Sequence, residues 1–385
     1  WAMVVPTIPV LAKHFAITPG TAAQVITALS VGRFAGMPIS GFVLDRFGAR
    51  TALIAGPLIA CLSAILAASM PWFALILIPV FFIGIADSIW VIAREIAGVD
   101  LVRADQRGRV LSGFHGINYL GLAFGPLIGG LLTEHIGFRA VFLAYAACAA
   151  LSTVIGWKIE ARHHPAPPAA DTAVATGWSV AAFAQRLRGI RNLFYEIRPE
   201  LRATYIVLVL ATFTSFAHRV TTQSIVPIFA SEMLHMTPKE IGLLFTISGL
   251  SVFAMILPAG FVIDKVGRKW ATVPSTGIPA IAFLLIPFAD SFFQLAVLLS
   301  FLGVANGLSL GSLATSTFDV VPAHARGRLQ ALRRTLAELG GVSAPLIGGY
   351  LADKFNPGVP FLAYAPLLIL AALLLAVMAR ETLEK

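Results

Sequence analysis

Charged residues are scarce in this chain, and their scarcity excludes a soluble fold. Asp, Glu, Lys and Arg make up only 12% of the 385 residues, while hydrophobic residues make up 58%. Soluble domains carry about 25% charge, and their surface helices need a polar outer face that most segments here lack. Apolar stretches long enough to cross a bilayer recur along nearly the whole length. We therefore expect an integral membrane protein.

Several features of soluble enzymes and pumps are also missing. The chain has only two cysteines, Cys61 and Cys148, both within apolar stretches, so we expect buried thiols and no disulfide. It has no glycine-rich phosphate-binding loop followed by lysine, which excludes an ATP-driven pump built from this chain alone. No Cys/His cluster has metal-binding spacing, and no group of residues is typical of an enzyme. We expect no catalytic residues, cofactor or metal.

What the chain does have is an internal repeat. Three segments recur at a constant offset of 219 residues: 41–48 at 260–267, 107–109 at 326–328, and 126–130 at 345–349. A constant offset means that the two halves are structurally equivalent. In an apolar chain, a duplicated half is typical of secondary transporters, which move one half against the other around a central site.

Length and helix breakers predict twelve membrane-spanning helices in an all-α protein. The predicted spans are 1–15, 20–44, 51–70, 73–101, 110–133, 139–159, 203–230, 239–263, 271–289, 292–320, 329–352 and 359–379. They form two pseudo-symmetric six-helix bundles, residues 1–160 and 203–385, joined by a linker over 161–202. Trp1 aligns with Val220, inside the seventh helix, so we expect the first helix to have lost its opening turns.

Basic residues predict the orientation in the membrane. The loops after spans two, four, eight and ten carry Arg46, Arg50, Arg103, Arg107, Arg109, Lys265, Arg268, Lys269, Arg326 and Arg328. The opposite loops carry only Lys13, Arg139, Lys239 and Lys354. The positive-inside rule then places both termini and the linker in the cytoplasm, with a bacterial inner membrane expected. It also explains the net charge of +9 without a nucleic-acid partner.

The linker changes character along its length. Its first part, Pro-rich and then Ala/Thr-rich, is typical of a flexible tether. Its second part has apolar residues at helical spacing beside arginines, which predicts an amphipathic helix on the anionic inner leaflet. The apolar residues are Phe183, Leu187, Ile190, Phe194 and Ile197. A simple spacer between the halves is an equal alternative.

The loop after the second span resembles the signature loop of the major facilitator superfamily, and the same loop recurs in the second half. The residues that carry the resemblance are Gly41, Asp45, Arg46, Gly48 and Arg50, then Gly260, Asp264, Gly267 and Arg268. The resemblance covers the whole chain. It implies a cytoplasmic latch that holds the outward-facing state, in which carboxylates meet the positive ends of helices.

The same resemblance implies that the second basic position of the loop pairs with an acid at the end of helix four or ten. In the second half this predicts the pair Arg268 and Asp319. In the first half Ala49 replaces the basic residue, so Asp100 must use Arg46 or Arg50 or stay unpaired. We also expect Gly41 and Gly260 to let neighbouring helices approach closely. The alternative is that these charges only orient the protein in the membrane.

A second motif of the family lies in helix five. It comprises Gly121, Gly125, Pro126, Gly129 and Gly130, and it is often taken as a mark of antiporters. Helix eleven repeats most of it, which favours a role in helix packing. An arginine that many drug–proton antiporters of the family carry in helix four is replaced here by Val80.

Polar residues within membrane spans are candidates for function, because burying them in lipid is unfavourable. Asp87 lies in the middle of helix four, with Trp90 and Arg94 on the same face. Arg334 and Glu338 have the spacing of an ion pair along one helix. The full set of substrate or coupling candidates is Asp87, Arg94, Arg219, Gln223, Arg33, His115, Asn118, Tyr119, Asn306, Arg334 and Glu338. For Asp87 the alternative is a carboxylate paired only for packing.

These observations favour secondary active transport of a small solute by a monomer, with protons as the coupling ion through Asp87 or Glu338. Export of drugs or metabolites is the leading hypothesis, and uptake of an organic anion is the alternative. Arginines outnumber acids within the spans, which favours an anionic substrate. A non-transporting membrane sensor on the same fold is a further alternative, although such a protein would be expected to lose its membrane-embedded charges.

Overall fold

The computed structural model describes the backbone of residues 1–100, 107–158, 194–322 and 325–381. It describes the side chains of the same ranges except 98–100, 107–116 and 327–328. Within these ranges every regular element is a helix. The protein is an all-α membrane protein, as the composition predicted.

The helices of the first half are the 3₁₀ helix η1 (Ala2–Thr7), α1 (Ile8–Phe15), α2 (Pro19–Ala22), α3 (Gln24–Ser69), α4 (Phe73–Asp100), α5 (Arg107–His135) and α6 (Phe138–Lys158). Those of the second half are α8 (Pro199–Met233), α9 (Pro238–Phe261), η2 (Val262–Val266), α10 (Arg268–Leu285), η3 (Ile286–Phe288), α11 (Phe292–Val320), α12 (Arg326–Lys354) and α13 (Val359–Met378). Within the described ranges, eight helices are long and apolar enough to cross a membrane.

Each predicted span corresponds to helix in the structure, with one difference at the signature loop. Spans two and three are continuous as α3, interrupted only by Gly48, whose φ of 78° and ψ of 168° are not helical. Its equivalent Gly267 has a φ of 146° and separates η2 from α10. Both turns use a positive φ that glycine adopts without a steric penalty. The chain therefore reverses direction over a single residue, where a longer loop was predicted.

Two further expectations need correction. Cys148 is exposed and Cys61 is partly exposed, so the thiols are not both buried. The apolar surroundings of Cys148 in the sequence reflect the outer surface of the bundle, which is apolar in a membrane protein. Of the apolar residues in the predicted linker helix, Phe194 and Ile197 are described. Ile197 is fully buried in a cluster with Tyr205 and Leu329, so it contacts protein and not lipid.

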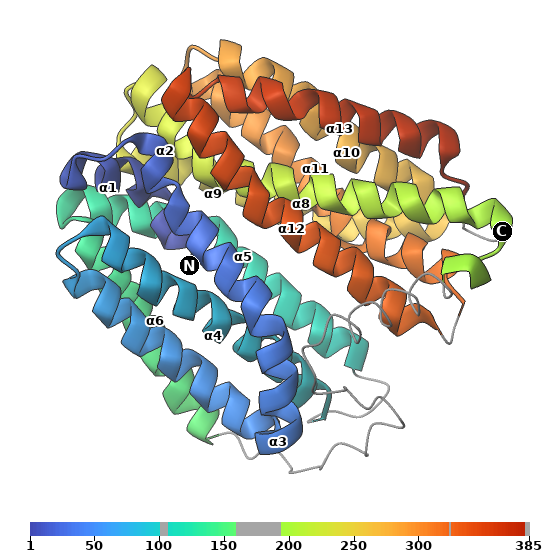
Figure 1. Ribbon diagram of the computed structural model, residues 1–385, viewed down its shortest axis with the longest axis horizontal. Helices are drawn as coiled ribbons and strands as arrows, with labels where there is room; N and C mark the ends of the chain where they lie inside the picture. The colour runs from blue at the N-terminus through green and yellow to red at the C-terminus, as the bar shows by residue number, and fades with distance from the viewer. Residues whose placement is uncertain (101–106, 159–193, 323–324, 382–385) are drawn as a thin grey trace, which may run out of the picture.

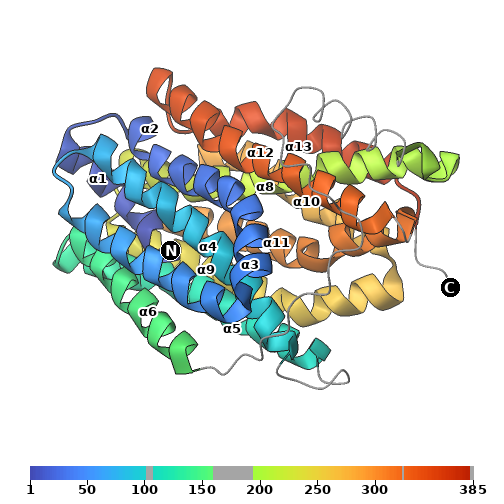
Figure 2. The same ribbon diagram turned by 60° about the horizontal axis from the view of Figure 1, so that its bottom comes forward.

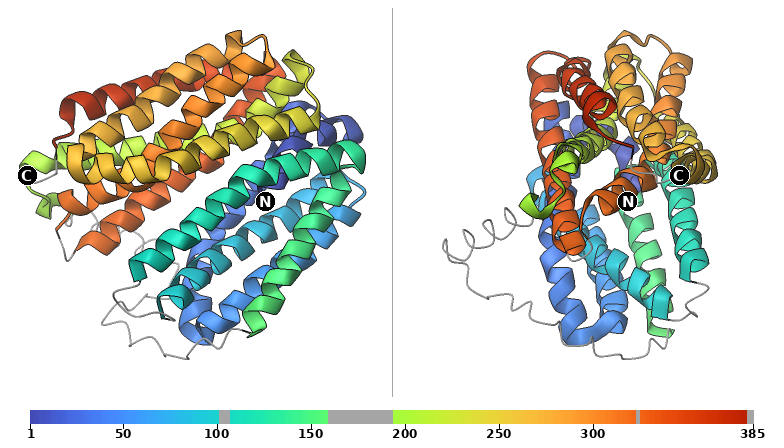
Figure 3. Two further views of the ribbon diagram at one scale, coloured as in Figure 1. Left: turned by 180° about the vertical axis from the view of Figure 1, so that it is seen from behind. Right: turned by 90° about the vertical axis from the view of Figure 1, so that its right-hand side faces the viewer.

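The two halves lie side by side and share an interface formed mainly by α5 of the first half and α12 of the second. α5 packs against α9, and α12 packs against α2 and α3. The halves are close together where α1 and α2 lie and diverge toward the opposite end (Figure 1; Figure 2). Figure 3 shows the same convergence from behind. We call the end that contains the start of α2 and the start of α9 the closed end.

Close contact between α3 and α4 positions the central polar residues of the first half. A Cβ added to Gly84 would lie 2.8 Å from both Arg33 N and Gly32 Cα, because the two backbones touch there. Gly303, the equivalent of Gly84, is in similarly close contact with Ser248 on α9. Small residues at a helix crossing allow this approach within a membrane. The packing therefore brings α3 and α4 together one turn away from Asp87.

The glycines of the two family motifs differ in how tightly they pack. Gly129 and Gly130 are in backbone contact with Met3 and Pro238. Nothing lies within 4 Å of a Cβ added to Gly41, Gly121 or Gly260. The expectation that Gly41 and Gly260 allow close helix approach is therefore wrong for this conformation. The reason is that the halves have separated at that end.

We expect Gly84→Ala to destabilise the protein by about 1–3 kcal/mol, because the added methyl group forces α3 away from α4. Thermal unfolding of the detergent-purified protein measures this effect. Gly121→Ala is the matched control, since it adds the same methyl group to a helix position with free space around it. Equal stability of the two variants would contradict the packing described above.

Candidate functional site

A cavity of about 740 Å³ lies between the two halves. This volume suits a small molecule. Its wall comes from η1, α3, α4 and α5 of the first half and from α8, α9, α11 and α12 of the second. The candidates predicted from the sequence that line it are Asp87, Arg94, Arg219, Gln223, Arg33, Asn118, Tyr119, Asn306, Arg334 and Glu338. His115 lies outside the residues whose side chains the structure describes.

An ion pair dominates the wall contributed by the first half. Arg33 Nε on α3 donates to Asp87 Oδ2 on α4 at 2.8 Å. Ser88 Oγ donates to the carbonyl of Arg33 at 2.9 Å, which ties the same two helices together. The sequence named both Arg33 and Asp87 but not their pairing. Only the crossing of α3 and α4 joins two residues that lie 54 positions apart.

The second half holds its arginine with neutral acceptors. Arg219 Nε on α8 donates to Asn306 Oδ1 on α11 at 2.8 Å, and its Nη2 donates to Ser309 Oγ. The ring of His218 lies 3.1 Å from the same Asn306 oxygen. His218 is 1% exposed and also contacts the carbonyl of Thr214, so it acts as a helix contact.

The acceptors on the two walls are equivalent in position and differ in charge, while the two arginines come from non-equivalent helices. Asn306 is the equivalent of Asp87 at the offset of 219 residues. Arg33 in the first half is neutralised by a carboxylate. Arg219 in the second half keeps its positive charge, because an amide and a hydroxyl accept its hydrogen bonds without carrying charge.

Arg94 adds a second cation to the first-half wall. Its guanidinium lies over the ring of Trp90, 4.6 Å from the ring centroid, as their spacing on one helix face predicted. Its Nε is buried and has no hydrogen-bond partner within the described residues. Arg94 also lines the cavity, and within the described residues no ion pair joins it to an acid.

The predicted ion pair between Arg334 and Glu338 is not formed. In the described part of the chain neither a hydrogen bond nor an ion pair joins them, although both line the cavity. Glu338 is only 8% exposed. The spacing on α12 allows a local pair, but the two side chains do not meet in the described structure.

Arg333, which the sequence placed beside Arg334, does not line the cavity. Its Nη1 donates to Thr212 Oγ1 on α8 at 2.7 Å, and its Nε donates to Gln330 Oε1 at 2.9 Å. Two adjacent positions on a helix point in directions about 100° apart. Arg333 therefore joins α12 to α8, while Arg334 faces the cavity.

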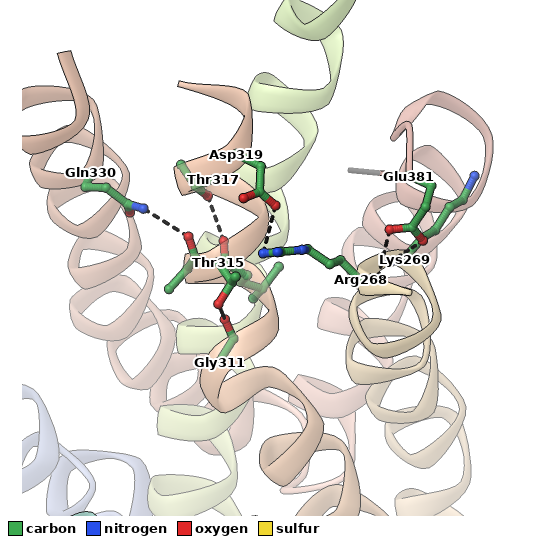
Figure 4. Close-up of polar contacts among 10 residues, drawn as sticks. Arg268, Lys269, Gly311, Thr315, Thr317, Asp319, Gln330 and Glu381 are labelled. Atoms are coloured by element: carbon green, nitrogen blue, oxygen red, sulfur yellow. Dashed lines mark hydrogen bonds and ion pairs between the residues drawn. The ribbon is translucent and has the colours of Figure 1, made fainter. Parts of the chain in front are cut away.

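The second-half signature loop contains the ion pair that the family resemblance implied. Arg268 Nη1 lies 2.8 Å from Asp319 Oδ2, and both side chains are mostly buried (Figure 4). Glu381 accepts from the backbone N–H groups of Arg268 and Lys269 at 2.9 and 3.1 Å (Figure 4). These N–H groups begin α10 and have no partner within their own helix. Sequence analysis missed Glu381, because it follows the last span.

The first-half loop has a different set of contacts. Asp45 and Arg46 are exposed, and the guanidinium of Arg46 lies 5.8 Å from the ring centroid of Phe47. Arg50 Nη2 donates weakly to the carbonyl of Trp157, at 3.4 Å. The side chain of Asp100 lies outside the described residues. Asp264, the equivalent of Asp45, is also exposed.

The chain is similar to two bacterial multidrug resistance proteins and to a solved transporter structure along most of its length. Multidrug resistance protein 2 of Bacillus subtilis is 22% identical over 382 residues, covering 94% of this chain and 86% of the relative. The multi-drug resistance efflux pump PmrA of Streptococcus pneumoniae is 27% identical over 385 residues, covering 94% and 88%. A solved structure of the xylose transporter XylE from E. coli, in an inward open conformation, has a TM-score of 0.74. It is 17% identical, and the match covers 100% of this chain and 93% of that one.

A sequence model of one transporter family matches both halves of the chain. The matched residues are 1–217 and 208–385, so the match covers the chain from end to end. The duplicated signature loop, the two six-helix halves and the cavity between them agree with that match. The chain belongs to the Major Facilitator Superfamily.

Proposed function

We propose that this protein is a proton-coupled exporter of small organic solutes that carry a negative charge. The observation that carries the proposal is Arg219, which faces the cavity and is hydrogen-bonded there to the neutral groups of Asn306 and Ser309. A cation held in this way retains its attraction for an anion in a cavity of low dielectric constant. The similar proteins named as multidrug transporters support export.

The charges of the whole cavity support an anionic solute. Its lining includes four arginines, Arg33, Arg94, Arg219 and Arg334, and three acids, Asp87, Glu95 and Glu338. Arg33 and Asp87 neutralise each other. Arg94 and Arg219 come from opposite halves, so a solute between them contacts both parts that move during transport. Planar guanidinium groups also bind carboxylates through two parallel hydrogen bonds.

The difference between two carboxylates supports proton coupling through Glu338. Asp87 forms an ion pair with Arg33, so the protein itself supplies the partner of its charge. Glu338 is buried and forms no ion pair within the described residues. A buried charge without a partner is unfavourable, so Glu338 is the acid on the cavity wall that binding of a proton would stabilise. We therefore assign proton exchange to Glu338 and the positioning of Arg33 to Asp87.

The proposed orientation places both termini and the linker in the cytoplasm, as the basic loops indicate. The closed end then faces the outside of the cell, and the end with the signature loops faces the cytoplasm. In this orientation the described conformation is the inward-facing one. A solute enters from the cytoplasm and leaves after the halves close around it.

We expect Arg219→Lys to raise the KM for an anionic solute about tenfold, because lysine loses one of the two directed contacts of arginine. Flux into proteoliposomes with an imposed pH gradient measures this, over pairs of solutes that differ only in a carboxylate or an amine. Arg333→Lys is the matched control, since Arg333 lies on the same bundle but outside the cavity. Preference for the amine of each pair would overturn the anionic proposal.

We expect Glu338→Gln to abolish accumulation driven by the pH gradient while preserving exchange of solute across the membrane without a gradient. The reason is that glutamine keeps the shape of the side chain but cannot carry a proton between the two sides. We expect Asp87→Asn to reduce both activities, because it leaves Arg33 without its carboxylate. Glu95→Gln is the control. If Asp87→Asn, and not Glu338→Gln, abolishes accumulation while preserving exchange, then Asp87 is the proton site.

We expect Arg268→Ala to lower the thermal stability of the detergent-purified protein, because the ion pair between Arg268 and Asp319 lies within the second half and is formed while the cytoplasmic end is open. Its loss removes about 1.5–3 kcal/mol of stabilisation, which thermal unfolding measures. Arg46→Ala is the control, because Arg46 is exposed and its guanidinium lies beside Phe47. Equal stability of the two variants contradicts a stabilising role for this ion pair.

A further inference from the structure

Two carboxylates join the halves at the closed end. Asp353, at the end of α12, accepts a hydrogen bond from Gly20 N at 2.7 Å and another from Thr18 Oγ1 at 2.6 Å. Glu134, at the end of α5, accepts a hydrogen bond from Lys239 N at 3.1 Å. Each carboxylate comes from one half and each donor from the other. Both contacts therefore break when the halves separate at this end.

The two contacts are equivalent by the internal repeat. Asp353 is Glu134 displaced by 219 residues, and Lys239 is Gly20 displaced by the same number. The preceding residues are also equivalent, since Thr18-Pro19 returns as Thr237-Pro238. The repeat has thus preserved a carboxylate and its backbone donor on both sides of the interface.

Glycines one turn before the carboxylates bring the backbones together. Gly130 is in contact with the carbonyl of Pro238, and a Cβ added to Gly349 would lie 2.7 Å from the carbonyl of Gly20. Gly130 on α5 and Gly349 on α12 are equivalent positions of the repeated motif. Larger residues there would hold the carboxylates out of reach of their donors. The motif therefore has a second use at this end, beyond packing within one half.

The donors are N–H groups that their own helices leave unpaired. α9 begins at Pro238, so the N–H of Lys239 lies in its first turn. Gly20 lies in the same position at the start of α2. N–H groups in a first turn lack a partner within the helix, and a nearby carboxylate is stabilised by them. Each contact therefore satisfies a group that water must satisfy after the halves separate.

We propose that Glu134 and Asp353 form two equivalent clamps that hold the closed end shut, and that both release when the transporter opens at that end. The Asp353 clamp is the stronger, because Asp353 also binds the hydroxyl of Thr18. Within the described residues Glu134 receives the backbone N–H of Lys239, and no bond joins it to the hydroxyl of Thr237, the equivalent of Thr18. This difference in the number of hydrogen bonds predicts that replacing Asp353 opens the closed end more than replacing Glu134 does.

The test measures access to the cavity from the closed end, without a substrate. The reporter is Leu122→Cys, which lines the cavity and is 41% exposed, in a chain whose Cys61 and Cys148 are replaced by serine. A membrane-impermeant maleimide is added to sealed vesicles from the side at which α2 and α9 begin. We expect Asp353→Asn to raise labelling about tenfold, Glu134→Gln less, and the double variant more than either.

Glu232→Gln is the matched control, because Glu232 is an exposed carboxylate near the same end and forms no clamp. Unchanged labelling in the double variant, or an equal rise in Glu232→Gln, overturns the proposal. If Asp353→Asn does not reach the membrane, Glu134→Gln alone gives the same test with a smaller expected rise. Labelling from the opposite side must fall as labelling from the closed end rises, which distinguishes a shift between conformations from partial unfolding.

Discussion

Every charge that this chain carries into the membrane must face another helix or the cavity, and this constraint shapes the interface between the halves. Lipid offers neither hydrogen bonds nor counter-ions. Arg33 meets Asp87, and Arg219 meets Asn306 and Ser309. Arg94 and Arg334 also line the cavity, and within the described residues no ion pair joins either of them to an acid.

The duplicated architecture makes the differences between the halves informative. Where both halves keep a residue type, as at Gly48 and Gly267, the residue serves the fold that both halves share. Where they differ on the cavity wall, the charge of the wall changes. The replacement of Asp87 by Asn306 leaves Arg219 charged, and the replacement of Tyr119 by Glu338 gives the second half a buried acid. These two substitutions account for the proposed anion and proton sites.

The protein carries acids beside helix starts at both of its ends, on different helices, which relates the clamps to the signature loops. Glu134 and Asp353 lie at the closed end of α5 and α12 and bind the starts of α9 and α2. Asp45 and Asp264 lie at the other end and are exposed in this conformation. Carboxylates beside helix starts therefore bind the opposite half at the closed end. At the other end, within the described residues, no hydrogen bond joins Asp45 or Asp264 to the opposite half.

The sequence alone determined the membrane class, the repeat and the position of every described span, because apolar length and a constant offset are properties of the chain itself. It also named ten polar residues that line the cavity, since polar groups within spans are rare, but it missed others such as Glu95. Only the tertiary structure decided their partners. Arg33 pairs with Asp87, because a helix crossing at Gly84 joins segments that lie far apart in the chain. Arg334 and Glu338 share a helix face, yet within the described residues no ion pair joins them. Periodicity places a side chain on a face of its own helix, but it carries no information about which helix lies opposite.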